Sequence, residues 1–230
     1  AGNDGIIYIF SIEHNTVFRW SSSDKRYIQP IYLNSNSTDF HQLPLRVAYS
    51  EEHQRIYLGY QNGEIKFVDL TDIDTVHHFT SLPLSVDGLA SVGNFILAQD
   101  ESGAWASHYI FDINGVQTDV KEWNQYSQVY AWNELNSRVY FLRGSTDLHY
   151  EEIDQSSGEI ISSGEVYSNN GYVGEATISF SNDGSLVILG NGNIHDSDTL
   201  EWKGAITAPS DALWLSNNDL VVIKKQHDEQ

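Results

Sequence analysis

The chain has 230 residues, of which 40% are hydrophobic, so it can bury a substantial core in one large domain or two small ones. Its 32 acidic residues outnumber 12 basic ones and give a formal net charge of -20, which would repel a phosphate backbone or an anionic membrane surface. No cysteine is present, which excludes disulfides, thiolate metal sites and a thiol nucleophile. No apolar run approaches the roughly 20 residues of a membrane helix. We therefore expect neither nucleic-acid binding nor membrane insertion.

Short runs rich in β-branched and aromatic residues recur along the chain, beginning with IIYIF at residues 6–10. The clearest stretch is LRVAYSEEHQRIYLGYQNGEIKFVDL at 45–70, where EEHQ and QNG separate three such runs and predict an antiparallel meander. The apolar, turn, apolar pattern returns as GLASVGNFIL, YAWNELNSRVYFL, ISFSNDGSLVIL and LWLSNNDLVVI. If Tyr57, Ile96, Tyr140, Val187 and Val221 are equivalent, the spacings are 39, 44, 47 and 34 residues. A period near 40 with this strand content predicts an all-β propeller of four-stranded antiparallel blades.

Each repeat is predicted to supply an inner strand with small residues, an apolar second strand, a third strand and a polar outer strand. Pro30 falls in one of the outer strands, where the edge of a blade tolerates it. Tyr49, Trp132, Phe180 and Trp214 fall at equivalent inner-strand positions, so we expect them in the core between blades. No segment has helical apolar spacing over three turns, so almost no helix is expected.

The two chain ends decide the expected number of blades. The chain enters at a second strand, 6–10, and leaves after a first and a second strand, 212–215 and 220–224. If 212–215 completes the first blade, a five-bladed ring closes, and this is the arrangement we expect. The alternative is part of a six- or seven-bladed ring. We expect residues 1–230 to form a single domain, alone or as a module of a longer chain.

RIYLGYQNGEIKFVDL and RVYFLRGSTDLHYEEIDQSSGEI resemble the repeat of YVTN-type, quinoprotein-like bacterial β-propellers. Only the copy at 138–160 has the "ID..SGEI" part of that pattern, and the copy at 193–206 departs from it. The resemblance implies an extracellular or periplasmic binding or spacer module. It transfers no site residue, since no quinone-binding or lactonase metal motif matches.

Propellers usually act at one mouth of the central channel, so the residues before the inner strands are the candidate ligand-binding set. These are Arg46, Asp87, Gln128, Glu175 and Asp211. Their carboxylates and guanidinium could hold a hard cation, a sugar or an amine, or they could simply be solvated loop residues. Trp105, in DESGAWASHY, is the tryptophan that we most expect to be exposed, and it joins this set.

Metal and nucleophile motifs are weak. DINGVQTD at 112–119 has two features of a calcium loop but is better explained as a hairpin turn. His77 and His78 alternate sides of a strand, and His195 with Asp196 lacks a third ligand. No G-x-S-x-G motif occurs. We expect no cofactor, with calcium as the one ion to test.

These patterns favour a non-enzymatic extracellular module that binds a protein or a glycan through its loops and channel mouth. One alternative is a propeller glycoside hydrolase with Asp87, Glu175 and Asp211 as its acids. The other is a structural module that holds neighbouring domains or subunits in a surface protein or filament.

Overall fold

The secondary structure of the protein consists of β-strands. The computed structural model describes residues 5–33, 43–100, 106–122, 129–143, 147–167, 177–207, 211–215 and 219–223. Among these residues no helix is present, and so none with the length and apolarity needed to span a bilayer. The chain divides into two compact units, Ala1–Asn124 and Gln125–Gln230, and each is described by itself.

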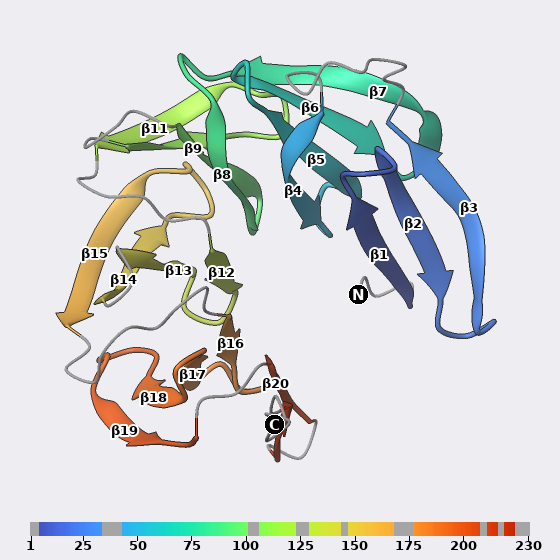
Figure 1. The fold of residues 1–230 in the computed structure, drawn as a ribbon. Helices are drawn as coiled ribbons and strands as arrows, with labels where there is room; N and C mark the ends of the chain where they lie inside the picture. Colours follow the sequence, from blue (N-terminus) through green and yellow to red (C-terminus); the bar gives the residue numbers. More distant parts are fainter. Residues whose placement is uncertain are drawn as a thin grey trace, which may run out of the picture. The chain divides into compact units, whose positions relative to one another are not determined.

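The first unit contains three antiparallel sheets whose strands follow one another in chain order (Figure 1). Sheet 1 consists of β1 (Ile6–Ser11), β2 (Thr16–Ser21) and β3 (Arg26–Tyr32). Sheet 2 consists of β4 (Pro44–Ser50), β5 (Arg55–Tyr60), β6 (Glu64–Asp69) and β7 (Asp72–Ser81). Sheet 3 consists of β8 (Val86–Val92), β9 (Phe95–Asp100), β10 (Ser107–Phe111) and β11 (Gln117–Glu122). The predicted four-strand meander is confirmed in sheets 2 and 3.

The second unit repeats this plan. Sheet 4 consists of β12 (Tyr130–Asn133), β13 (Arg138–Arg143), β14 (Asp147–Ile153) and β15 (Ile160–Tyr167). Sheet 5 consists of β16 (Ile178–Phe180), β17 (Leu186–Leu189), β18 (Asn193–Asp196) and β19 (Trp202–Ala205). Sheet 6 pairs β20 (Asp211–Trp214) with β21 (Leu220–Ile223). That 212–215 completes the first blade stays a prediction.

Turn chemistry sets the register of these meanders. In the turn QNG between β5 and β6, Gly63 has φ of 84°, a backbone conformation that side chains with a Cβ rarely adopt. Between β14 and β15, the carboxylate of Asp154 accepts hydrogen bonds from the N–H groups of Ser156 and Ser157. As predicted, Pro30 lies in β3, which is an edge strand of its sheet.

Successive sheets of the first unit pack face to face. We call the side of a sheet that contacts the following sheet its forward face, and the side that contacts the preceding sheet its rear face. The forward face of sheet 1, with Tyr8 and Val17, packs on the rear face of sheet 2, with Tyr49 and Ile56. The rings of Tyr8 and Tyr49 stack 5.2 Å apart. Adjacent sheets therefore share one hydrophobic core.

The forward face of sheet 2 packs on sheet 3 in the same way. Tyr57 and Phe79 from sheet 2 lie in one cluster with Ile96 and Phe111 from sheet 3. In the second unit, Tyr140 from sheet 4 packs on Val187 and Phe180 from sheet 5. The predicted core positions of Tyr49 and Phe180 are confirmed.

One feature of the predicted repeat alignment is wrong. Tyr57 and Tyr140 lie on forward faces, whereas Ile96 and Val187 lie on rear faces, so these residues are not equivalent. Tyr57 pairs with Ala48, and Tyr140 pairs with Ala131, but the residue opposite Ala90 is Leu97. The turns differ in length, since four residues join β4 to β5, two join β8 to β9 and five join β16 to β17. A shift of one residue moves every side chain to the opposite face.

Gly59 marks a close approach between sheets 2 and 3. A Cβ at this position would lie 2.5 Å from Cγ1 of Val86, so we expect Gly59→Ala to lower the free energy of unfolding by about 1–3 kcal/mol. Chemical denaturation measures this change. Val86→Ala in the Gly59→Ala background should make the double variant more stable than the sum of the single effects predicts. Strict additivity would contradict the proposed clash.

Candidate functional site

Two of the predicted channel-mouth residues, Arg46 and Asp87, form an ion pair. Nη2 of Arg46 lies 2.9 Å from Oδ1 of Asp87, and Nε donates to the main-chain oxygen of Asp87 at 2.5 Å. Nη1 of Arg46 donates to the main-chain oxygen of Leu45 at 3.0 Å. Both side chains are largely shielded from solvent. The guanidinium thus joins the innermost strands of sheets 2 and 3 and neutralises Asp87.

Irregular backbone geometry directs the side chains of Arg46 and Asp87 toward each other. The pairing of β4 with β5 shifts between Pro44 and Arg46, and the pairing of β8 with β9 shifts between Val86 and Gly88. Such bulges redirect the local side chains, so Asp87 turns from the ladder toward the neighbouring strand β4. Arg46 and Asp87 were predicted to precede the inner strands, but they lie within β4 and β8, close to the strand starts. The contact between β4 and β8 brings them together.

The side chains of the other members of the predicted set lie outside the described part of the chain, so none of them is placed beside this ion pair. Trp105, Gln128 and Glu175 lie outside them. Asp211 is the first residue of β20, but its side chain also lies outside the description. Their proposed role in ligand binding stays a prediction.

A second polar site joins sheets 2 and 3 near the other ends of these strands. The guanidinium carbon of Arg55 lies 4.1 Å from the ring centre of Phe67, and its Nε lies 3.7 Å from Oδ2 of Asp69. Nη1 of Arg55 donates to the main-chain oxygen of Ile113, in the hairpin that follows β10, at 2.9 Å. One side chain therefore combines a cation–π contact, an ion pair and a hydrogen bond to the next sheet.

His53 extends this contact. Its Nε2 lies 2.9 Å from the main-chain oxygen of Asn94, and its Nδ1 lies 2.7 Å from the hydroxyl of Tyr57. Since a carbonyl only accepts, Nε2 carries the proton and Nδ1 accepts from Tyr57. Burial lowers the pKa of His53 and raises the pKa of Tyr57. This arrangement keeps the imidazole and the phenol neutral.

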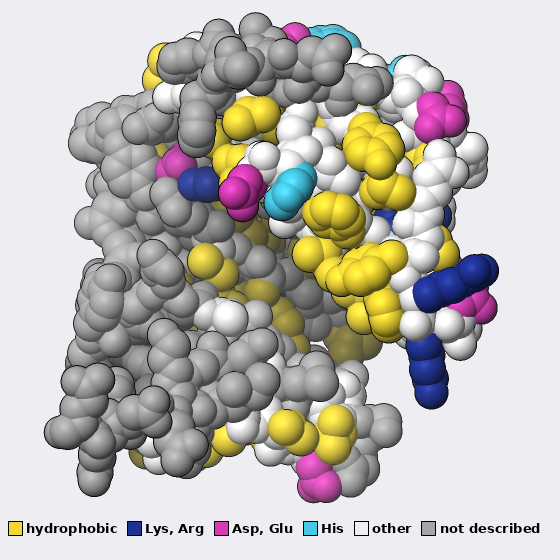
Figure 2. All heavy atoms as spheres, turned by 45° about the vertical axis from the view of Figure 1, so that its right-hand side comes forward, with side chains coloured by type: hydrophobic (Ala, Val, Ile, Leu, Met, Phe, Trp, Pro, Cys, Tyr) yellow, Lys and Arg dark blue, Asp and Glu magenta, His cyan; other side chains and the backbone are white. Residues whose placement is uncertain are grey.

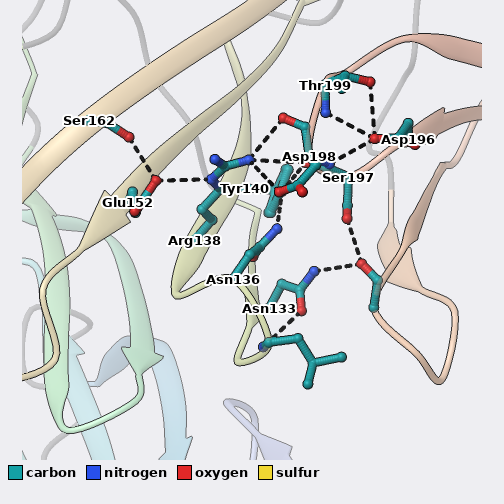
Figure 3. A network of polar contacts seen from close by, with 12 residues as sticks. Asn133, Asn136, Arg138, Tyr140, Glu152, Ser162, Asp196, Ser197, Asp198 and Thr199 are labelled. Carbon is teal, nitrogen blue, oxygen red and sulfur yellow. Dashed lines mark hydrogen bonds and ion pairs between the residues drawn. The ribbon is translucent and has the colours of Figure 1, made fainter.

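The second unit contains the same contact between sheets 4 and 5 (Figure 3). Arg138 lies 4.1 Å from the ring centre of Tyr150, its Nε donates to Oε2 of Glu152 at 3.3 Å, and its Nη1 donates to the main-chain oxygen of Asp198 at 2.9 Å. The hydroxyl of Tyr140 donates to the main-chain oxygen of Ser197. Burial raises the pKa of Tyr140.

We call these two arrangements, centred on Arg55 and Arg138, the arginine latches. Neither was predicted, yet the sequence holds a signal for them. Each arginine begins a second strand, an aromatic residue follows twelve positions later, and an acidic residue follows fourteen positions later, as Phe67 with Asp69 and Tyr150 with Glu152. In each latch the polar groups of the arginine bind the next sheet, so the role of the latch is structural.

In the predicted acidic turns, the carboxylates accept hydrogen bonds from main-chain N–H groups of the same turn. The carboxylate of Asp112 accepts hydrogen bonds from the N–H groups of Asn114 and Val116, so DING forms the hairpin between β10 and β11. His195 contacts the main-chain oxygen of Leu200 at 3.0 Å, while Asp196 accepts from the N–H of Thr199. His77 stacks on Phe67. Across the described ranges, no three His, Asp or Glu side chains gather as a metal site would require.

Comparison with known proteins shows the fold. No family model and no curated protein matches the sequence. Hydrazine synthase from Kuenenia stuttgartiensis superposes on 96% of this chain and 80% of its own, with a TM-score of 0.67 and 12% identity. A chain of the mitotic checkpoint complex matches 96% of this chain and 68% of its own, with a TM-score of 0.64 and 13% identity.

A third match is dihydro-heme d1 dehydrogenase NirN, with a TM-score of 0.65 and 12% identity over 96% of this chain. All three are propeller structures. The chain is a β-propeller with about five blades. It spans about half the length of NirN, since the match covers 48% of that chain. At this level of identity the similarity establishes the fold alone, and the sheets described above are its blades.

The ion pair of Arg46 and Asp87 should stabilise the packing of the first unit. A double-mutant cycle with Arg46→Ala and Asp87→Ala is expected to give a coupling free energy of about 1 kcal/mol in urea unfolding. The exposed pair of Lys203 and Glu201, joined at 2.7 Å, is the matched control and should show a smaller coupling. Equal couplings would contradict a structural role for the Arg46–Asp87 pair.

Asp183 should make the stability of the second unit depend on pH in the acid range. Hydrogen bonds from Ser181 and Ser185 lower its pKa from 3.8 to about 2. A depressed carboxylate pKa contributes stability that is complete above the unfolded value and is lost as the pH falls through the folded value. The advantage of the wild type over Asp183→Asn should therefore hold above pH 3.8 and shrink toward about pH 2.

Guanidinium unfolding of both proteins between about pH 6 and about pH 2 measures this difference. Ser185→Ala removes one hydroxyl donor, so it should raise the pKa of Asp183, which carboxylate NMR can follow. A difference in stability that does not change with pH would rule out the assigned hydrogen bonds.

Proposed function

We propose that this propeller is a non-enzymatic interaction module that binds a protein partner outside the cytoplasm. Its repeat resembles YVTN-type, quinoprotein-like propellers, and this resemblance supports an extracellular or periplasmic location. The net charge of -20 favours solubility through mutual repulsion and disfavours contact with anionic surfaces. The main support is one exposed apolar surface in the first unit.

That surface is the rear face of sheet 1. Ile7, Ile9, Phe18, Trp20 and Tyr27 lie on it, because Ile7 pairs with Trp20, Ile9 with Phe18, and Trp20 with Tyr27. Ile7 is 41% exposed, Ile9 43% and Tyr27 61%. At the corresponding positions of sheet 2, Ile56 is 1% exposed and Leu58 0%. Figure 2 shows hydrophobic side chains gathered on this part of the first unit.

An exposed cluster of this composition favours a protein partner. The rings of Trp20 and Tyr27 meet edge to face at 4.9 Å, and Ile7 and Ile9 extend the surface with branched aliphatic groups. Sugar sites instead combine aromatic faces with several polar groups. A glycan partner remains the alternative, and it would use Tyr27 and Tyr32, which is 64% exposed.

The glycoside hydrolase alternative draws less support from the geometry. Of its three candidate acids, Asp87 is engaged by the guanidinium of Arg46 at 2.9 Å and is largely shielded from solvent. A glycosidase needs two acids that face the substrate across a cleft. No specific contact favours this function.

Site-specific cross-linking tests the proposed function. A photoreactive phenylalanine analogue in place of Tyr27, in the full chain in its native host, should form a discrete adduct with one polypeptide that mass spectrometry identifies. The same analogue at Val116, which is 59% exposed on the hairpin after β10, is the matched control. Ile9→Asp should abolish the Tyr27 adduct. Absence of any adduct, together with hydrolysis of chromogenic glycosides that Asp87→Asn abolishes, would overturn the proposal.

A further inference from the structure

We infer that His53 makes the contact between sheets 2 and 3 sensitive to protons in the mildly acidic range, whereas the corresponding contact between sheets 4 and 5 is insensitive. Each of these contacts lies within a single unit of the chain, and each contains one of the two arginine latches. The difference between them arises from one side chain in the adjoining turn. It does not depend on the partner proposed above.

The turn next to each latch places one side chain against the tyrosine of the second strand. Between β4 and β5 this side chain is His53, four residues before Tyr57, and its Nδ1 lies 2.7 Å from the hydroxyl. Between β12 and β13 it is Asn136, four residues before Tyr140, and its Nδ2 donates to the hydroxyl at 3.0 Å. The histidine of the first latch therefore has an asparagine as its counterpart in the second.

The tyrosine hydroxyl donates to a different kind of acceptor in each latch. The hydroxyl of Tyr140 donates to the main-chain oxygen of Ser197, which accepts at every pH. The hydroxyl of Tyr57 donates to Nδ1 of His53, because Nε2 of that ring donates to the main-chain oxygen of Asn94. An imidazole nitrogen accepts only while the ring is neutral. The hydrogen bond of Tyr57 therefore depends on the protonation state of His53.

Protonation of His53 turns Nδ1 into a donor that faces another donor. The hydroxyl of Tyr57 must then point its hydrogen elsewhere, although the residue is fully buried. The guanidinium of Arg55 donates to the same hydroxyl oxygen and has no acceptor to offer. Because a buried hydroxyl without an acceptor and a buried imidazolium are both unfavourable, protonation favours an opening of the contact that admits water to these groups.

The groups that face His53 come from both sheets. Burial has the largest effect and lowers the pKa of His53 from 6.5. The hydrogen bond to Asn94 and the carboxylates of Glu52 and Asp112 oppose this shift in the pKa. The guanidinium of Arg55 adds to it, since a second positive charge is unfavourable there. In the folded protein the ring therefore takes up its proton at a lower pH than in the unfolded chain.

The direction of this difference sets the pH range of the effect. The stability that the neutral ring contributes is complete above pH 6.5 and is lost as the pH falls through the lower pKa of His53 in the folded protein. In the second latch, Asn136 gains no proton in this range and the main-chain oxygen of Ser197 continues to accept. Mild acid should therefore loosen sheet 2 from sheet 3 and leave the contact between sheets 4 and 5 in place.

Amide hydrogen exchange of the full chain, followed by mass spectrometry of its peptides, tests both latches at once. After correction for the intrinsic pH dependence of exchange, the opening constant of β5 should rise by about threefold or more between about pH 7 and about pH 5. The opening constant of β13 should rise less over the same range. His53→Asn gives the first latch the side chain of the second, so it should remove the rise in β5.

The matched control is His14→Asn. His14 is also the third residue of a four-residue turn, between β1 and β2, and its ring meets Phe18 edge to face at 5.9 Å, as the ring of His53 meets Tyr57. Since Phe18 has no hydroxyl, His14→Asn should leave the rise in β5 as it is in the wild type. Equal pH responses of β5 in the wild type and in His53→Asn would overturn the inference.

Proton NMR of the histidine rings tests the assigned hydrogen bond. The signals of His53, identified by their loss in His53→Asn, should titrate below pH 6.5. Tyr57→Phe removes the O–H donor that favours the neutral ring, so it should raise the pKa of His53 toward 6.5. Thermal unfolding followed by circular dichroism verifies that each variant is folded. A His53 ring that titrates at or above pH 6.5, or whose titration is the same in Tyr57→Phe, would contradict the proton-sensitive contact.

Discussion

The packing of one apolar sheet face on the next is the constraint on which this structure depends. A single four-stranded sheet cannot bury its own faces, so each blade gains its core from its neighbours. In β5 the consecutive residues Ile56, Tyr57 and Leu58 are each at most 1% exposed, since both faces of the strand are covered. At roughly 25 cal/mol per Å² of buried apolar surface, these contacts supply the dominant stabilising free energy. Two arginines are placed at the rims of these interfaces.

The arginine latches show how the rims are built. Arg55 and Arg138 lay their planar guanidinium groups over Phe67 and Tyr150 and direct their N–H donors to the hairpins of the next sheets. A guanidinium can stack and donate at once, whereas a lysine ammonium offers neither the plane nor the fork of donors. The latches tie sheets 2 and 3, and sheets 4 and 5, at the ends of strands whose centres are apolar. They therefore add direction to a packing force that by itself has none.

The strands, the turns and the propeller fold could be predicted from the sequence. Turn residues mark the ends of the strands, and the strand pattern repeats with a period near 40. The sequence did not predict which face Ile96 and Val187 occupy, because a strand buried on both sides has no polar alternation to mark its faces. Arg46 and Asp87 were predicted to lie before the inner strands, whereas they lie within β4 and β8. Their ion pair was not predicted, since bulges at Leu45 and Asp87 set the side-chain directions. The latches were missed although their spacing of twelve and fourteen residues recurs.

The same constraint explains why the rear face of sheet 1 matters. At rear-face positions of the second strand, Ile56, Ile96 and Val187 are at most 1% exposed, whereas Ile7 and Ile9 are more than 40% exposed. A surface selected only for contact with water gains nothing from isoleucine beside tryptophan and tyrosine, and such a cluster carries a risk of aggregation. The residue types are those of a blade interface, and sheet 1 already satisfies its forward face with Tyr49 and Ile56. The apolar character of the rear face is therefore the observation on which the proposed protein partner rests.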